Sequence, residues 1–150
     1  MLQEYVDKRK LSLMKVETYQ EILIFVAGTT PQIITETLYG LTQGVESPIF
    51  PDEIHTITTS GGKEKVEEEL FRKGRLSAFS KEYNLPAIPL GAESIHVIDD
   101  EKGRFLEDIR EVSHNELLGD FIANFIREKT EDPGVRLHCS LAGGRKTMSF

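Results

Sequence analysis

Residues 137–148, near the end of the chain, have the residue types and spacing of a phosphate-binding turn. A short apolar segment ends at the hydroxyl residue Ser140, and two glycines and the cations Arg145 and Lys146 follow. If this segment is a strand that opens through a glycine turn onto a helix, backbone N–H groups and the positive end of the helix dipole converge on one point. The alternative is a turn that needs glycine for its backbone, with two solvated cations. The residues expected at a phosphate are Ser140, Ala142, Gly143, Gly144, Arg145, Lys146 and Thr147.

A second turn of this kind follows the apolar run Glu21–Ala27. Gly28 turns the chain, Thr30 suits a helix N-cap, and Pro31 suits the first helical position. The turn lacks the lysine and the glycine spacing of a P-loop, and it does not match the GxGxxG dinucleotide fingerprint. Its hydroxyls and free N–H groups nevertheless form a candidate phosphate site. The residues expected there are Gly28, Thr29, Thr30 and Gln32.

A third small and polar turn, Ser60-Gly61-Gly62, follows an alternating, β-branched segment at residues 53–60 that predicts a strand. The three turns therefore each follow a predicted strand. Because the carboxyl ends of parallel strands share one edge of a sheet, we expect the turns to lie along the same edge. Three hydroxyl-rich glycine turns at one edge are hard to explain by packing alone and favour a phosphate-bearing ligand.

The order of the predicted elements is typical of an α/β fold: an open, mainly parallel sheet of the Rossmann type with helices on both faces. The nearly continuous apolar run Glu21–Ala27 predicts a central strand, and the helix after it carries apolar residues at helical spacing. The later predicted elements are helices at 63–73 and 76–83 separated by Gly74, a short strand at 85–90, a hairpin at 95–106, a helix with a Ser113–Glu116 capping box and an apolar stripe at 117–126, and a strand at 135–140 after an Asp132-Pro133-Gly134 stop.

The 150-residue length predicts one domain, at residues 21–150, preceded by a polar N-terminal extension at residues 1–20. The net charge of −7 argues against binding of long nucleic acid, which needs a basic face, although a small phosphorylated ligand can occupy a locally positive pocket. No apolar run is long enough to span a membrane, and charged residues interrupt any signal-peptide core. Cys139 is expected to be a small core residue in a buried strand, and a cytoplasmic location is the default expectation.

The other candidate residues carry weaker signals. His55, His96 and His138 lie in predicted strands, so core or edge positions are favoured over a general-base role. Arg104 and Arg110 are secondary candidates for ligand contact, with surface charge as the favoured interpretation. The spacing of His, Cys, Asp and Glu gives no convincing metal cluster, so neither a metal nor another cofactor is expected.

Four segments together resemble the CRISPR-associated Rossmann fold (CARF) proteins, and most closely the small CRISPR-associated ring nucleases: Gly28–Thr37, Ile95–Val97, Asp108–Arg110 and Leu137–Met148. The resemblance covers roughly Ile22 to the C-terminus. It implies a domain that binds a cyclic oligoadenylate, the second messenger of type III CRISPR antiviral defence, across the two-fold axis of a homodimer. Cyclic tetra-adenylate is the favoured ligand and cyclic hexa-adenylate the alternative.

The resemblance also implies that the ring is cleaved without a metal into linear products that end in a 2′,3′-cyclic phosphate. Lys146 is then expected to stabilise the developing charge, and Thr30 or Thr29 to position the reacting groups. One alternative is a sensor that binds without cleaving and regulates an effector domain that this sequence lacks. Another is a generic Rossmann-like enzyme that acts on a nucleotide or sugar phosphate. The sequence departs from the family in stopping at Phe150, within the expected helix after the glycine turn, so a fragment or an unusually short domain is expected.

Overall fold

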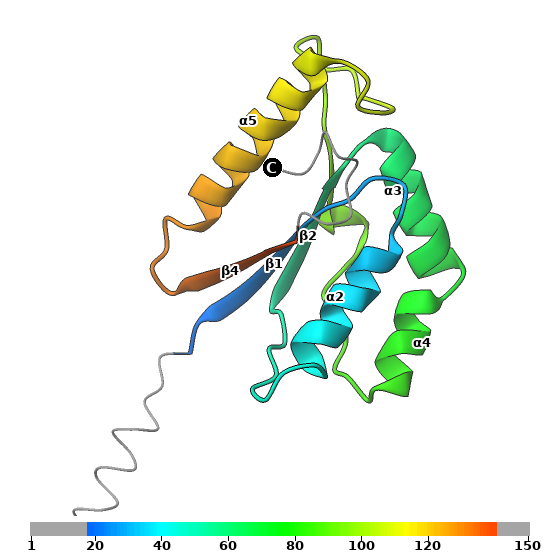
Figure 1. The fold of residues 1–150 in the computed structure, drawn as a ribbon, viewed down its shortest axis with the longest axis vertical. Helices are drawn as coiled ribbons and strands as arrows, with labels where there is room; N and C mark the ends of the chain where they lie inside the picture. The colour runs from blue at the N-terminus through cyan, green and yellow to red at the C-terminus, as the bar shows by residue number, and fades with distance from the viewer. Residues whose placement is uncertain (1–17, 141–150) are drawn as a thin grey trace, which may run out of the picture.

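The computed structural model describes residues 18–140, in which four parallel strands form one sheet in the order β3-β2-β1-β4. Helix α5 covers one face of the sheet, and α2, α3 and α4 cover the other (Figure 1). This arrangement confirms the predicted Rossmann-like fold. In chain order the elements are β1 Gln20–Val26, α2 Gln32–Thr42, β2 Glu53–Thr58, α3 Ser60–Val66, a π-helical segment η1 Glu67–Arg72, α4 Arg75–Glu82, a 3-10 turn η2 Ala92–Ser94, β3 Ile95–Val97, α5 Val112–Lys129 and β4 Val135–Ser140.

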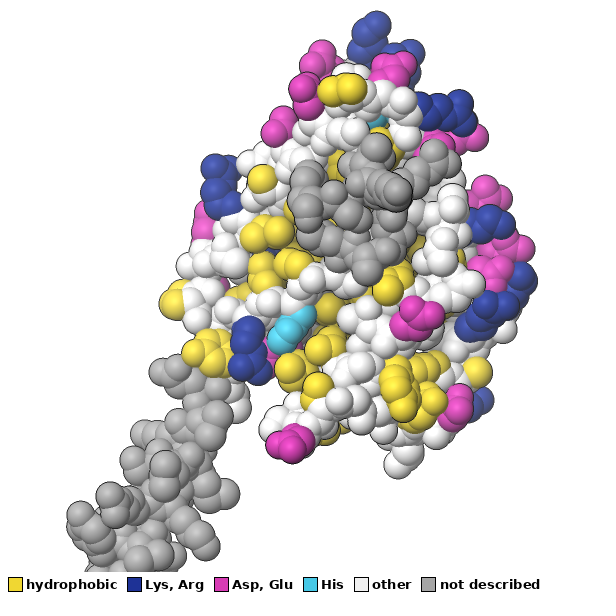
Figure 2. Space-filling model, in the orientation of Figure 1, with side chains coloured by type: hydrophobic (Ala, Val, Ile, Leu, Met, Phe, Trp, Pro, Cys, Tyr) yellow, Lys and Arg dark blue, Asp and Glu magenta, His cyan; other side chains and the backbone are white. Residues whose placement is uncertain are grey.

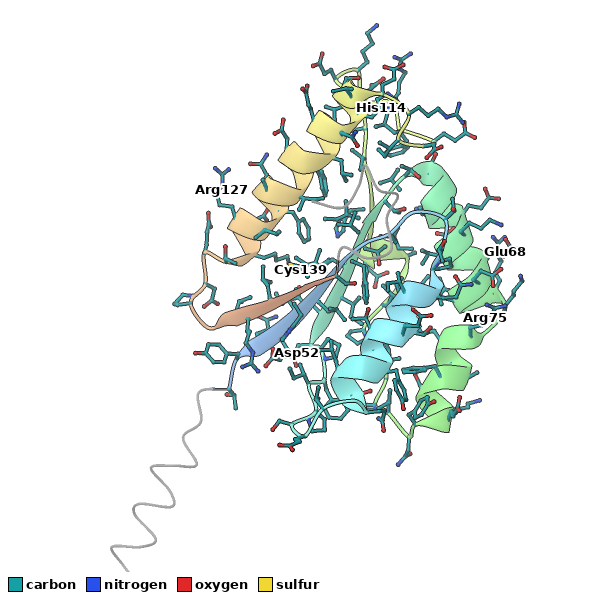
Figure 3. All side chains as sticks on the ribbon, viewed as in Figure 1. Asp52, Glu68, Arg75, His114, Arg127 and Cys139 are labelled. Atoms are coloured by element: carbon teal, nitrogen blue, oxygen red, sulfur yellow. The ribbon has the colours of Figure 1, made fainter. Side chains whose placement is uncertain are left out.

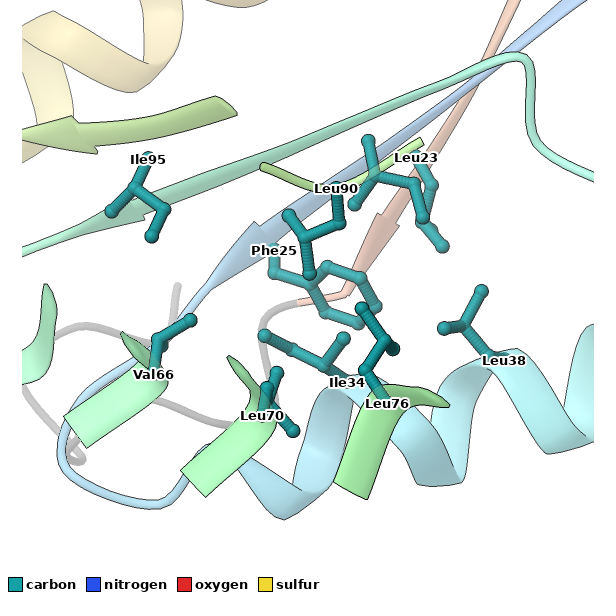
Figure 4. Close-up of a cluster of buried hydrophobic side chains, with 10 residues drawn as sticks. Leu23, Phe25, Ile34, Leu38, Val66, Leu70, Leu76, Leu90 and Ile95 are labelled. Atoms are coloured by element: carbon teal, nitrogen blue, oxygen red, sulfur yellow. The ribbon is translucent and has the colours of Figure 1, made fainter. Parts of the chain in front are cut away.

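Strand β1 lies inside the sheet and is buried on both faces. Ile22, Ile24 and Val26 belong to the core beneath α5, whereas Leu23 and Phe25 belong to the core beneath α2, α3 and α4. Figure 4 shows the second core, with Phe25 surrounded by side chains from the helices. Because successive side chains of a strand point to opposite faces, a strand between two helical layers buries side chains on both faces, which favours a nearly continuous apolar run. The prediction of a central strand from this run is confirmed.

Strand β4 was expected to be buried, and this expectation is wrong. It pairs only with β1 among the described residues, so it is an edge strand there. Val135 and Leu137 pack beside α5, whereas Cys139 is exposed on this strand (Figure 3). Apolar and polar residues alternate along β4, which is the pattern of a strand with one covered face.

Two predicted helix caps are also wrong. Helix α2 begins at Gln32, with Pro31 at the N-cap and no side-chain cap, so Thr30 does not cap it. Helix α5 begins at Val112 with Glu111 at the N-cap, so Ser113 lies inside the first turn instead of capping it. In contrast, α4 begins directly after Gly74, whose φ of 68° confirms the predicted break.

The segment after α4 differs from the prediction in one further respect. Residues 85–90 form no strand, because two prolines remove the N–H groups that a sheet ladder needs, although Leu90 is still buried in the core. The predicted hairpin is reduced to a turn with a single antiparallel bridge between Asp99 and Phe105. The predicted strand at its start is confirmed as β3, which pairs in parallel with β2. The stop at residues 132–134 and the last strand at 135–140 are confirmed.

Candidate functional site

The strand order reverses beside β1. The chain proceeds from β1 to β2 to β3 in one direction, and α5 then returns it across the other face to β4, on the opposite side of β1. The carboxyl ends of β1 and β4 therefore flank a topological switch point, where open parallel sheets bind their ligands. The predicted turn Gly28–Gln32 follows β1 at this point, and Ser140 ends β4 in register with Phe25.

The turn after β1 presents unpaired polar groups. Thr29 and Thr30 are exposed between the buried residues Gly28 and Pro31, and neither hydroxyl has a hydrogen-bond partner within residues 18–140. Helix α2 starts here, and its first turn contains no acidic residue. The positive end of the helix dipole and the first free N–H groups of α2 therefore follow the exposed Thr29 and Thr30, with no carboxylate in the first turn. This combination suits an anionic ligand.

The turn after β2 is engaged by the protein itself. Residues Ser60-Gly61-Gly62 form the first turn of α3 and not a loop before it, because the side chain of Thr59 caps the helix by accepting the N–H of Gly62 at 3.2 Å. The N–H of Ser60 donates to the carbonyl of Leu106 at 2.8 Å, and that of Gly61 donates to Glu107 at 3.3 Å. In this conformation, the N–H groups expected to hold phosphate are used by the segment after β3.

Of the residues predicted to form a site after β4, the structure describes only the first, Ser140. Ser140 is half-buried and, together with Thr37, Leu41 and His138, lines an open cavity of about 280 Å³ beside α2. The other residues predicted there, namely Ala142, Gly143, Gly144, Arg145, Lys146 and Thr147, lie outside the described residues.

The sequence matches the model of a known protein family. The family described as CRISPR-associated protein NE0113 (Cas_NE0113) matches residues 30–150, which include α2, both later candidate turns and all strands after β1. The chain belongs to this CRISPR-associated family. No curated protein and no solved structure shows a significant match.

The structure also shows a hydrogen-bonded cluster of three titratable side chains, Glu53, His55 and His96, that was not predicted from the sequence. His55 Nε2 lies 2.9 Å from Glu53 Oε2, and His55 Nδ1 lies 3.0 Å from His96 Nε2. A carboxylate only accepts, so the Nε2–H of His55 donates to Glu53. The rings pack against Phe121 and Phe125 of α5. The sequence signal is the two-residue spacing of Glu53 and His55, which puts both on one face of a strand.

Acidification is expected to destabilise the protein through the cluster of Glu53, His55 and His96. Burial lowers the pKa of His96, and the nearby His55 and Lys129 lower it further. The hydrogen bond from His55, with Lys129 also donating, lowers the pKa of Glu53. The unfolded state therefore binds more protons once the pH falls below the ordinary histidine value of about 6.5, and the free energy of unfolding decreases as pH decreases.

Urea denaturation at neutral pH and at about pH 5.5 measures this dependence. We expect His96→Gln to reduce the loss of stability on acidification, because the variant removes the buried group whose pKa is lowered in the folded protein. Equal pH dependence in the wild type and His96→Gln would contradict this assignment.

The remaining candidate side chains form ion pairs. His138 lies 2.6 Å from Glu21, which also binds Arg136. Arg104 pairs with Asp100 at 2.8 Å, and Arg110 lies 3.7 Å from Asp108, with side chains that are 71% and 67% exposed. Both arginines line an open cavity of about 330 Å³ at the base of the turn at residues 100–104.

The surface over α3, η1 and α4 carries both signs of charge. Basic and acidic side chains are interspersed there (Figure 2), and Glu69 pairs with both Lys73 and Arg75. Within residues 18–140, no three His, Cys, Asp or Glu side chains are grouped to hold a metal ion. None of the helices in that range is long and apolar enough to cross a bilayer.

Proposed function

We propose that this CRISPR-associated protein binds a cyclic oligoadenylate at the carboxyl edge of its sheet, and cleaves the ring without a metal. The observation that carries the proposal is the position of the turn after β1: exposed Thr29 and Thr30 and the N-terminus of α2 meet at the topological switch point beside β4. Membership of a CRISPR-associated family supports a ligand from that defence system.

The chemistry of the ligand fits small, separate anion sites. A cyclic oligoadenylate carries one negative charge per phosphate in a closed ring, so each phosphate needs only a local donor cluster. In a homodimer, each cluster occurs twice around the two-fold axis. Thr29, Thr30 and Gln32 would serve one phosphate, and the glycine turn with Arg145 and Lys146 would serve the next.

The proposed cleavage is an internal transfer that needs no water. A ribose 2′-oxygen attacks the neighbouring phosphorus, and the bond from phosphorus to the 5′-oxygen breaks. The 2′-hydroxyl loses its proton, and the departing 5′-oxygen gains one. The products end in a 2′,3′-cyclic phosphate and a 5′-hydroxyl. Thr30 or Thr29 would hold the 2′-oxygen in line with the phosphorus, and Lys146 would stabilise the charge that develops on the phosphoryl oxygens.

A sensor that binds without cleaving is the second candidate. The turn Gly28–Gln32 contains no histidine or carboxylate, and His138, on the adjacent strand, is paired with Glu21. A site with no acid or base in the turn after β1 favours binding over proton transfer.

Incubation of the full chain with cyclic tetra- and hexa-adenylate in EDTA tests the proposal. Bound and cleaved nucleotides are resolved by chromatography. We expect linear products in EDTA for the wild type, with the rate lowered by about 10²–10³ in Lys146→Ala. Lys81→Ala, at an exposed lysine of α4, is the matched control and should cleave normally. Tight binding without products would make the protein a sensor. No binding of either ring would contradict the proposed function and favour a generic nucleotide-phosphate enzyme.

A further inference from the structure

We infer that Thr58 is a positioning residue for the turn after β1, an inference that rests on the proposed function in assigning that turn to ligand binding. Thr58 is the last residue of β2 and is fully buried. Its hydroxyl donates to the carbonyl of Ala27 at 2.6 Å, across to the residue immediately before Gly28. The side chain therefore fixes the chain at the point where it leaves the sheet.

The hydroxyl of Thr58 continues the β1–β2 ladder by one step. The strand pairing ends at Val26 and Ile57, after which the N–H of Ala27 still donates to Ile57 at 3.1 Å. The backbone carbonyl of Thr58 cannot continue the ladder toward β1, because it accepts the N–H of Ile98 on the other side at 3.0 Å. With the Thr58 hydroxyl in place, both polar groups of Ala27 are held by β2. Within residues 18–140, loss of the hydroxyl would leave the buried carbonyl of Ala27 without a partner.

Helix α3 also packs against the end of β2 and the Gly28 turn. A Cβ atom at Gly62 would lie 1.9 Å from Thr58 Oγ1 and 2.9 Å from the carbonyl oxygen of Gly28. Only a glycine therefore allows the first turn of α3 to rest on both Thr58 and the Gly28 turn. The first turn of α3 therefore packs against Thr58 and the carbonyl of Gly28, which precedes Thr29 and Thr30 in the chain.

Backbone NMR order parameters of Gly28, Thr29 and Thr30 in the ligand-free protein test this inference independently of ligand. In Thr58→Val, which keeps the shape and removes the hydroxyl, we expect them to fall from about 0.85 toward about 0.6, with no comparable change in β1 or α5. Thr58→Ser restores the hydroxyl and should remain near the wild type. Thr56→Val is the matched control, since Thr56 is equally buried on the same strand and its hydroxyl has no partner within residues 18–140.

Cyclic tetra-adenylate affinity is the second readout on the same variants. Loss of one hydrogen bond that orders the turn is expected to weaken binding by about 10-fold in Thr58→Val, and to leave Thr58→Ser and Thr56→Val unchanged. Unchanged order parameters in Thr58→Val would overturn the inference, as would loosening of the turn in Thr58→Ser equal to that in Thr58→Val. If the wild type binds no cyclic oligoadenylate, the proposed function fails, while the order parameters still decide whether Thr58 positions the turn.

Discussion

Replacing Gly62 with alanine is expected to destabilise the protein by about 3 kcal/mol, the upper end of the usual range for overpacking. The added methyl group would meet Thr58 Oγ1 at 1.9 Å and the carbonyl oxygen of Gly28 at 2.9 Å. Neither atom can move away at low cost, because the hydroxyl is bonded to Ala27 and the carbonyl belongs to the backbone. Chemical denaturation measures the effect as a lowered midpoint at constant slope.

Gly40→Ala is the matched control. Gly40 also lies in a helix, α2, but a Cβ atom there has no neighbour within 4 Å among residues 18–140 outside its own helix backbone. The same substitution should stabilise the protein by up to about 1 kcal/mol, since alanine is the better helix former. Opposite signs at the two glycines are therefore expected. A Gly62→Ala protein as stable as the wild type would show that α3 does not rest on the Gly28 turn.

Phe25→Ala is expected to have the largest effect on stability, a loss of about 3–5 kcal/mol. Phe25 is fully buried on β1 and fills the centre of the core beneath α2, α3 and α4 (Figure 4). Truncation would remove the transfer free energy of the ring and leave a cavity among Ile34, Leu38 and Leu70. Phe105→Ala, at a side chain that is 68% exposed, should change the stability by less than about 0.5 kcal/mol. A loss below about 1 kcal/mol in Phe25→Ala would contradict this description of the core.

The parts of the fold that rest on long apolar patterns could be predicted from the sequence. The nearly continuous apolar run at β1 and the end of the helix at Gly74 follow from local sequence patterns, and contacts with distant residues do not change them. The caps could not be predicted, because several hydroxyl and acidic residues compete near each helix start: Thr59, and not Ser60, caps α3. The burial of Cys139 was predicted wrongly because cysteine is usually a buried residue, although the alternating pattern of β4 indicates a strand with one covered face.

The arrangement of the turns along the sheet could be predicted from the sequence, but their contacts with the rest of the protein could not. Small, polar turns after strands indicated the carboxyl edge of the sheet, and the order β3-β2-β1-β4 brings the ends of β1 and β4 together there. The use of the Ser60 and Gly61 N–H groups by residues 106 and 107 depends on a segment more than 40 residues away in the sequence. The same holds for the hydrogen bond between Thr58 and Ala27 and for the pair of His55 and His96. Contacts between residues far apart in the chain produce no local sequence pattern from which they could be predicted.

Cyclic oligoadenylate binding at the turn after β1 is tested most directly by an NMR titration of the isotopically labelled full chain with cyclic tetra-adenylate. We expect the amide signals of Gly28, Thr29, Thr30 and Gln32 to shift and saturate, with linear tetra-adenylate as the control that shifts them less. The amides of Ser60 and Gly61 should shift less than these, because they remain bonded to Leu106 and Glu107. Saturating cyclic tetra- or hexa-adenylate that leaves Gly28–Gln32 unchanged would contradict the proposed site.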